Sequence, residues 1–324
     1  MTKRSICRAF LAMAAGVMLF PVAAQDFPTR PARIVVPNAA GGPTDGMARL
    51  LAEGLSKRWP HPVVVENRAG GNMIIGTTAV AQAPADGHTI GLIGMPHIVN
   101  PALQEKMPYR ALEDFSPVIH LAHIPLVVAV SPSLGAGSIA ELVRMAKDRP
   151  GALNYSSTSQ AGAGHLAAEM FRLRAGIQIG LVSYGGAAPA MVDLLAGRVP
   201  VMFGALNAVE SHIRWGAVRG IAVTTDRRIA ALPDVPTMIE AGFPGFTVSA
   251  WLGLVVRAGT PEATIAKINE GVAAILQSGE DRAKLQAQGW TVLPIGPERQ
   301  AFGDFLRSEQ AKWSLVIREA GIKP

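Results

Sequence analysis

Short apolar segments and amphipathic stretches alternate along the first hundred residues. The apolar segments are rich in Val, Ile and Leu, as in buried strands, and the stretches between them have the spacing of helices with one apolar face. The expected elements are strands at 33–37, 62–66 and 89–93 and helices at 43–59 and 74–83. This order predicts parallel strands joined by crossover helices.

The same pattern restarts further along the chain. The expected elements are helices at 138–149, 163–175, 187–197 and 207–215 and strands at 152–156, 177–183, 199–203 and 218–224. They predict a second parallel α/β unit, which resembles the first in layout but not in residues. A chain of 324 residues is also long enough for two domains.

Two long apolar stretches separate the units. Residues 117–131 and 246–256 are too long for one ordinary strand, and we expect both to cross between lobes. Helices starting near 260 and spanning 297–319 follow the second stretch. The predicted fold is therefore α/β with two lobes, each a mostly parallel sheet flanked by helices. Lobe 1 comprises 25–125 and 249–324, and lobe 2 comprises 126–248.

The N-terminus has the features of a secretory signal. Three basic residues precede an apolar run, and small residues end at Ala24, where we expect cleavage. A buried N-terminal helix is the alternative. Cys7, the only cysteine, lies inside this segment 1–24, so the mature chain would have no disulfide or thiolate site. Export without cysteine favours a bacterial periplasm.

Composition and charge limit the kinds of molecule that the protein could bind. The chain is 49 % hydrophobic and 17 % charged, with a formal net charge of +6, part of which belongs to the signal. A mild positive charge without a Lys/Arg cluster argues against nucleic-acid binding. No apolar run after the signal has the length of a membrane span. We expect a monomer.

Motifs for catalysis, metals and cofactors are scarce. The sequence has no G-x-S-x-G, H-E-x-x-H or P-loop pattern. His120 and His123 have H-x-x-H spacing, but in a regular strand they would point to opposite faces, which does not suit a metal. Loose G-x-G-x-x-A patterns at 135–140 and 162–167 lack the acidic residue of a dinucleotide site. We therefore expect no enzyme activity, metal or cofactor.

Each unit has a polar, glycine-containing loop that opens a helix. These loops are PNAAGGPTDG at 37–46 and NYSSTSQAGAGH at 154–165. Glycines allow a ligand to approach the backbone, and free amides at a helix start favour an anion. We expect Asp45 to act as a first-turn helix cap, because its carboxylate would repel an anionic ligand. The alternative is that both loops are ordinary turns.

Several segments in order resemble the Bug family of periplasmic substrate-binding proteins, the receptors of tripartite tricarboxylate transporters. These segments include IVVPNAAGGPTD (34–45), VVVENRAG (63–70), VSYGGAAPAMVDLLAGRV (182–199), LPDVPTMIEAGFPG (232–245) and WLGLVVRAGTP (251–261). The resemblance implies the type II periplasmic-binding-protein fold. It also implies a carboxylate held by the two loops through backbone amides, hydroxyls and bridging waters.

Positions matching the family pattern give a candidate ligand site. The expected ligand-binding residues are Asn38, Ala40, Gly41, Gly42, Thr44, Asp45, Met95, His97, Ser156, Ser157, Thr158, His165, Tyr184, Gly185, Gly186, Ala187, Gly204 and Asn207. Gly185 stands where the family commonly has lysine, and Gly204 where it commonly has aspartate. If both positions face the cleft, a second ligand charge would lose its partner, and an apolar group such as an aromatic ring would fit better.

Three functions remain open. The first is a periplasmic receptor that delivers a small carboxylate to the membrane subunits of a transporter. The second is a ligand sensor that presents its closed form to a sensor kinase. An exported enzyme is third, because the sequence shows neither a nucleophile–base pair nor a metal constellation.

Overall fold

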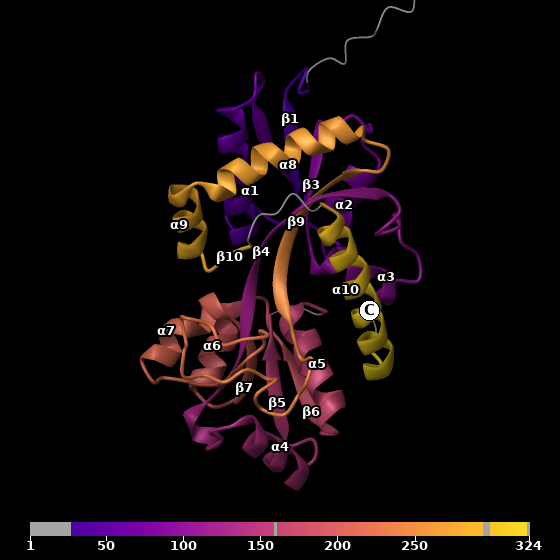
Figure 1. Ribbon diagram of the computed structural model, residues 1–324. Helices are drawn as coiled ribbons and strands as arrows, with labels where there is room; N and C mark the ends of the chain where they lie inside the picture. Colours follow the sequence, from indigo (N-terminus) through magenta and orange to yellow (C-terminus); the bar gives the residue numbers. More distant parts are fainter. Residues whose placement is uncertain (1–26, 159–160, 294–298, 323–324) are drawn as a thin grey trace, which may run out of the picture.

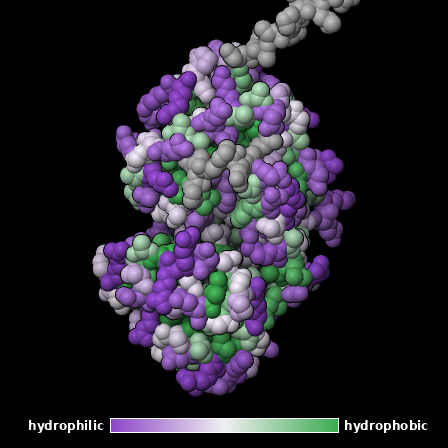
Figure 2. Space-filling model, in the orientation of Figure 1, coloured by the Kyte–Doolittle hydropathy of each residue, from purple (hydrophilic) through white to green (hydrophobic). Residues whose placement is uncertain are grey.

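The structure is a computed structural model that describes residues 27–158, 161–293 and 299–322. It has two α/β lobes linked by two long strands (Figure 1), which confirms the predicted two-lobed fold. The outline of the molecule narrows between the lobes in Figure 2. The predicted signal segment 1–24 lies outside the described residues.

Lobe 1 is built on a mixed sheet with strand order β2-β1-β3-β9-β4. β1 pairs in parallel with β2 and β3, and β9 runs antiparallel to β3 and β4. Its elements are β1 (Ala32–Val36), α1 (Pro43–Ser56), β2 (Val63–Asn67), α2 (Ile74–Ala81), β3 (Thr89–Gly94), α3 (Met95–Leu103), β4 (Phe115–Val130), β9 (Ser249–Arg257), α8 (Glu262–Gln277), α9 (Gly279–Ala287), β10 (Thr291–Val292) and α10 (Arg299–Ala320).

Lobe 2 continues the sheet from β4 through β7 and β5 to β6, with β8 also paired to β4. β5 is parallel to both of its neighbours, β6 and β7. The elements are a short 3₁₀ turn (Pro132–Leu134), α4 (Ile139–Asp148), β5 (Leu153–Ser157), α5 (Ala163–Ala175), β6 (Ile179–Ser183), α6 (Ala187–Leu195), β7 (Val201–Ala205), α7 (Leu206–Arg214) and β8 (Arg219–Val223).

β4 belongs to both lobes. Residues 115–125 of this strand pair with β9 in lobe 1, whereas 126–130 pair with β7 and β8 in lobe 2. Its lobe 2 half is buried on both faces, and Val127 and Val128 have no exposed surface. A strand buried on both faces reads as a continuous apolar run, which explains why the long stretch could be recognised in the sequence.

Helices cover both faces of the sheets and create two apolar cores. In lobe 1, α1 and α8 pack on one face and α2, α3 and α10 on the other. α10 also reaches lobe 2, where it packs against α5 (Figure 1). There the Arg172 guanidinium donates to the carbonyl oxygen of Ala320 at 3.4 Å. The C-terminal helix therefore contacts both lobes.

Besides the short 3₁₀ turn Pro132–Leu134, three observed elements were not expected from the sequence. α3 contains Pro96 in its first turn and Pro101 inside the helix, and proline removes a backbone donor that a helix normally uses. In α9 only Leu285 is buried, so no apolar stripe marks it. β10 is two residues long and is defined by its pairing with β4.

The prediction that His120 and His123 point to opposite faces of their strand was wrong. The register of β4 against β9 shifts between His120 and Ala122, and such a bulge inserts one extra residue. Both rings consequently face α10: His120 lies 4.5 Å from the Phe305 ring, and His123 lines a cavity with Phe305. Burial lowers the pKa of His120 to about 4.

Gly253 allows α10 to pack against the hinge strand β9. A Cβ atom at this position would lie 2.1 Å from the ring of Phe302, which is itself packed against Trp251 and Phe305. We predict that Gly253→Ala lowers the free energy of unfolding by about 1–3 kcal/mol, measured by urea denaturation, because the aromatic cluster must shift. Gly279→Ala is the matched control, since nothing lies within 4 Å of its Cβ position. Equal effects of the two substitutions would contradict the packing argument.

Candidate ligand-binding cleft

A cavity of about 430 Å³ lies between the lobes, within the size range of small-molecule sites. Its lining residues come from both lobes and from both hinge strands. They are Pro43, Thr44, Ile124, Leu126, Thr158, Ala163, Gly164, Ala187, Met202, Phe203, Gly204, Ala205, Asn207, Ala208, Ala250 and Trp290. None of these side chains is charged, so the described part of the lining offers apolar surface, hydroxyls, an amide and an indole.

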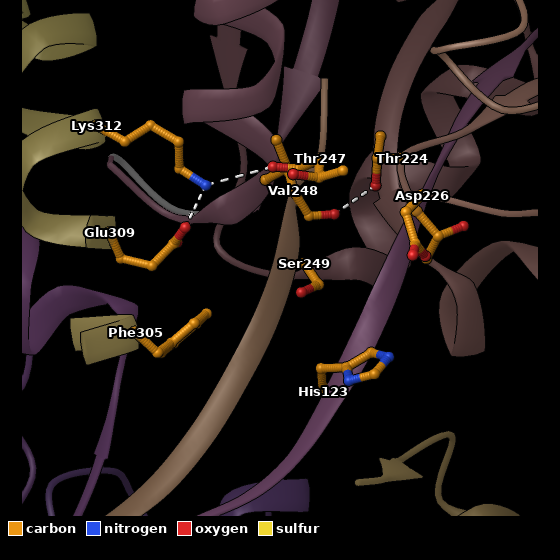
Figure 3. Close-up of a pocket in the computed structure, with 10 residues that line it drawn as sticks. His123, Thr224, Asp226, Thr247, Val248, Ser249, Phe305, Glu309 and Lys312 are labelled. Atoms are coloured by element: carbon orange, nitrogen blue, oxygen red, sulfur yellow. Dashed lines mark hydrogen bonds and ion pairs between the residues drawn. The ribbon is translucent and has the colours of Figure 1, made fainter. Parts of the chain in front are cut away.

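A second cavity of about 330 Å³ lies on the other face of the hinge strands, beside α10 (Figure 3). Side chains alternate along a strand, and His123 and Ser249 line this cavity while their neighbours Ile124 and Ala250 line the cleft. Some of its polar groups bind one another. Lys312 is paired with Glu309 and donates to the carbonyl of Thr247 at 3.3 Å.

The side chain of Thr224, which also lines the second cavity, is hydrogen-bonded to the backbone next to the hinge strands. Its hydroxyl donates to the carbonyl oxygen of Val248 at 2.5 Å and accepts from the backbone N–H of Leu126 at 3.2 Å. These bonds join the loop after β8 to both hinge strands. We therefore take the cleft as the candidate ligand site and assign a structural role to Thr224 and to the Lys312–Glu309 pair.

Four helices begin at the cleft. The first residues of α1, α5, α6 and α7 line it, and none of these helices has a side-chain cap. By contrast, the hydroxyls of Ser138 and Ser278 cap α4 and α9. The first N–H groups of a helix have no helical partner and carry partial positive charge. Uncapped helix starts around one cavity give it donors for an anion without any cationic side chain.

Asp45 fixes the shape of the first loop. Its buried carboxylate accepts from the Gly41 N–H at 3.0 Å, from Arg49 at 2.8 Å and from Asn67 at 3.0 Å. Asn67 also donates to the carbonyl of Asn38 at 3.2 Å. The bond from the Gly41 N–H, with φ of +87° at this glycine, shows that Asp45 organises the loop that precedes α1.

The second loop is organised by a histidine. The Nδ1 atom of His165 in α5 accepts from the N–H of Ala161 at 2.9 Å, and burial lowers the pKa of this ring. Ser156 and Ser157 are buried at the end of β5, and the Ser156 hydroxyl donates to the carbonyl of Val201 at 3.4 Å. Of the predicted residues in this loop, Thr158 lines the cavity.

The structure brings together five of the predicted ligand-binding residues at the cavity wall: Thr44, Thr158, Ala187, Gly204 and Asn207. Ala40, Gly41 and Gly42 form the loop before α1, where a Cβ atom at Gly42 would meet nothing within 4 Å. Gly185 and Gly186 also border open space. At Gly204 a Cβ would instead lie 2.7 Å from Val209, so Val209 occupies the space that a larger residue would need.

Three predicted residues have other partners. His97 is buried in the core of lobe 1, where its Nε2 donates to the carbonyl of Ala111 at 2.7 Å, and Met95 lies in the same core. The Tyr184 hydroxyl donates to Asp193 at 2.5 Å. Burial and this bond raise the pKa of Tyr184 to about 12. The structure does not place His97 or Met95 in the wall of the cleft.

Several cleft residues were not expected from the sequence. Ile124, Leu126 and Ala250 come from the hinge strands, where they read as ordinary core positions. Met202 and Phe203 belong to β7, where they also read as ordinary core positions. Trp290 follows α9, a helix that the sequence pattern did not predict because it buries only Leu285. Only the meeting of the two lobes makes these residues neighbours.

Within residues 27–158, 161–293 and 299–322, no group of three or more His, Cys, Asp or Glu side chains could hold a metal ion. Among the helices of the same residues, none has both the length and the apolar character that a bilayer crossing needs.

The Asp45 network predicts a pH dependence. The hydrogen bonds from Arg49 and Gly41 lower the pKa of this carboxyl from 3.8 to about 2. A pKa below that of the unfolded chain means that ionised Asp45 stabilises the fold above about pH 4 and that this contribution is lost between about pH 4 and 2. We predict that the wild type exceeds Asp45→Asn in unfolding free energy by about 1–2 kcal/mol at pH 6, and that the difference shrinks over this interval in urea denaturation. A constant difference would contradict the prediction.

Comparison with known proteins places this architecture in a family. The sequence profile of the tripartite tricarboxylate transporter family receptor matches residues 47–322. The chain is 38 % identical over 305 residues to protein BugT of Bordetella pertussis, covering 94 % of this chain and 93 % of BugT.

Solved structures agree with the sequence comparison. A structure described as R. palustris Rpa4515 with adipate is 36 % identical, covers 92 % of this chain and 100 % of its own, and has a TM-score of 0.78. MatC from Rhodopseudomonas palustris with bound malate is 30 % identical, covers 90 % and 100 %, and has a TM-score of 0.75. The periplasmic binding protein BugD is 32 % identical, covers 92 % and 99 %, and has a TM-score of 0.75. The chain belongs to the tripartite tricarboxylate transporter receptor family, whose Bug members are periplasmic solute-binding proteins.

Proposed function

We propose that this protein is exported to the periplasm, captures a small organic acid in the cleft and delivers it to the membrane subunits of a tripartite tricarboxylate-type transporter. The observation that carries the proposal is the set of uncapped N-termini of α1, α5, α6 and α7 around one uncharged cavity. A carboxylate there would accept bonds from backbone N–H groups that otherwise lack helical partners. The ligands named for Rpa4515 and MatC, adipate and malate, are also carboxylates.

The buried charge of Asp45 is compatible with an anionic ligand. Arg49, Gly41 and Asn67 all donate to its two oxygens, so the carboxylate is compensated within the loop. Because the Gly41 N–H is used by Asp45, the donors left for the ligand are those of Gly42 and the first turn of α1. Pro43, at the first position of this helix, has no N–H and adds no donor.

The remainder of the cavity favours a ligand with one charged end. Its wall is formed largely by Ile124, Leu126, Met202, Phe203, Ala250 and Trp290. In this proposal the helix starts compensate one carboxylate, and a second one placed against the apolar wall would meet no cationic side chain there, so its charge would be buried without compensation at a cost. The preferred ligand is therefore a monocarboxylate with an apolar or aromatic body.

A panel of acids tests this preference. We predict that pentanoate, benzoate or nicotinate raises the melting temperature of the purified protein at millimolar concentration by several degrees more than succinate, adipate, malate or citrate does. Stabilisation by the multiply charged acids alone would contradict the single-charge assignment. No stabilisation by any acid of the panel would contradict carboxylate binding itself.

Gly42→Val tests the role of the first loop. Gly42 has φ of −86° and ψ of 172°, which valine can adopt, and its Cβ would point into open space next to the start of α1. We predict at least a hundredfold loss of affinity in calorimetric titration with the most stabilising acid of the panel, because the branched side chain blocks access to the backbone donors. Gly279→Val, at the first position of α9, is the matched control. Retained affinity in a folded Gly42→Val variant would remove this loop from the site.

A further inference from the structure

Lobe 1 contacts lobe 2 through the turn 288–290, which follows α9. The side-chain amide of Asn207, in the first turn of α7, donates to the carbonyl oxygen of Gln288 at 3.2 Å. A Cβ atom at Gly289 would lie 2.4 Å from the Cβ of Asn207, so the backbone of the turn lies directly against this residue. Only a residue without a side chain permits this approach between the lobes.

The same turn also contacts the first turn of α1 in its own lobe. The side-chain oxygen of Gln288 lies 3.0 Å from the position that a Cβ atom would take at Gly46. The turn therefore lies between the starts of α1 and α7, two of the helices that begin at the cleft. Asn207 and Trp290 line the cavity together with Thr44 of α1, so this contact between the lobes lies on the cleft side of the hinge strands.

A second contact between the lobes lies on the other side of the hinge strands. There α10 packs against α5, and Arg172 donates to the carbonyl oxygen of Ala320. In Figure 1, α9 and β10 lie on one side of the hinge strands, above α7, and α10 lies on the opposite side, beside α5. Lobes that turn about a hinge separate on one side and approach on the other. Opening of the cleft therefore parts the turn 288–290 from α7 and leaves α10 on the side that closes up.

We propose that Asn207, Gln288 and Gly289 form a latch that holds the cleft closed over its ligand. Asn207 is then a positioning residue that acts through closure and not through a bond to the ligand. The apparent affinity of a ligand falls with the fraction of protein in the binding-competent form, so the latch sets affinity without contacting the ligand. It consequently affects different acids equally. This inference rests on the proposed function, because it takes the cleft as the site that closes on an acid.

Gly289→Ala tests the latch by blocking it. The φ of +85° strains alanine in the open and in the closed protein, so the strain cancels from the affinity, whereas the clash with Asn207 exists only when the lobes are closed. We expect at least a tenfold loss of affinity in calorimetric titration for each acid among pentanoate, benzoate, nicotinate and adipate that binds the wild type. The loss should lie mainly in the dissociation rate, measured by stopped flow.

A second substitution should rescue the first. Asn207→Gly removes the Cβ, Cγ and Nδ2 atoms that the new methyl group would meet. The double variant Gly289→Ala/Asn207→Gly should therefore recover the affinity of Asn207→Gly alone, which we expect about two- to fivefold below the wild type because one hydrogen bond is lost. Gly242→Ala is the matched control for strain, because its φ is +94° and nothing lies within 4 Å of its Cβ position. It should lose stability and keep the wild-type affinity.

Small-angle scattering tests the latch without any acid. Ligand-free Gly289→Ala should have a larger radius of gyration than the wild type, and the double variant should lie closer to the wild type. Equal radii of the wild type and Gly289→Ala, unequal losses among the acids, or a double variant as weak as Gly289→Ala would overturn the latch but leave carboxylate capture standing. If no acid of the stability panel binds the wild type, the proposed function falls, and the scattering comparison decides on the latch.

Discussion

The antiparallel pairing of β4 with β9 supports everything else in the structure. β4 is 16 residues long. It pairs with β9 in lobe 1 and with β7 and β8 in lobe 2. The two lobes therefore share one sheet, and the faces of the two hinge strands become two different environments. One face carries the cleft, and the other carries Trp251, His120 and the helix α10. Side-chain alternation at 123–124 and 249–250 separates them.

This arrangement provides the physical basis for the proposed binding of an anion in a cleft whose described wall has no cationic residue. Parallel strands bring the starts of the following helices to the same edge of a sheet, and two lobes facing each other bring several such edges to one cavity. The partial charges at those helix starts are fixed in place and need no buried counter-ion. Asp45 uses the same chemistry within the loop, where Arg49 and backbone N–H groups hold its charge.

The sheet also restricts what each lobe can contribute to selectivity. The backbone donors come from helix starts and are similar in kind, so under the proposed function they would recognise a carboxylate and little else. Discrimination between ligands would then depend on the side chains of the hinge strands, β7 and the turn 288–290. Apart from the indole of Trp290, the residues that these segments contribute to the described cavity wall are apolar. The side-chain amide of Asn207 is engaged in a hydrogen bond across the lobes.

The amino-acid pattern by itself determined the two α/β units and the long crossing strands. Val127 and Val128 lie in an unbroken apolar run because their strand is buried on both faces, and such burial is visible along the chain. The same holds for the glycine loops before α1 and α5, whose residues are local in sequence. Local patterns could not reveal α9, which buries a single leucine, or the bulge in β4 that turns His120 and His123 to one face. Local patterns also could not show that Ile124, Ala250 and Trp290 line the same cavity, or that His97 is buried in the core of lobe 1. Those outcomes depend on which lobe meets which strand face, and that was decided by tertiary packing between residues far apart in the sequence.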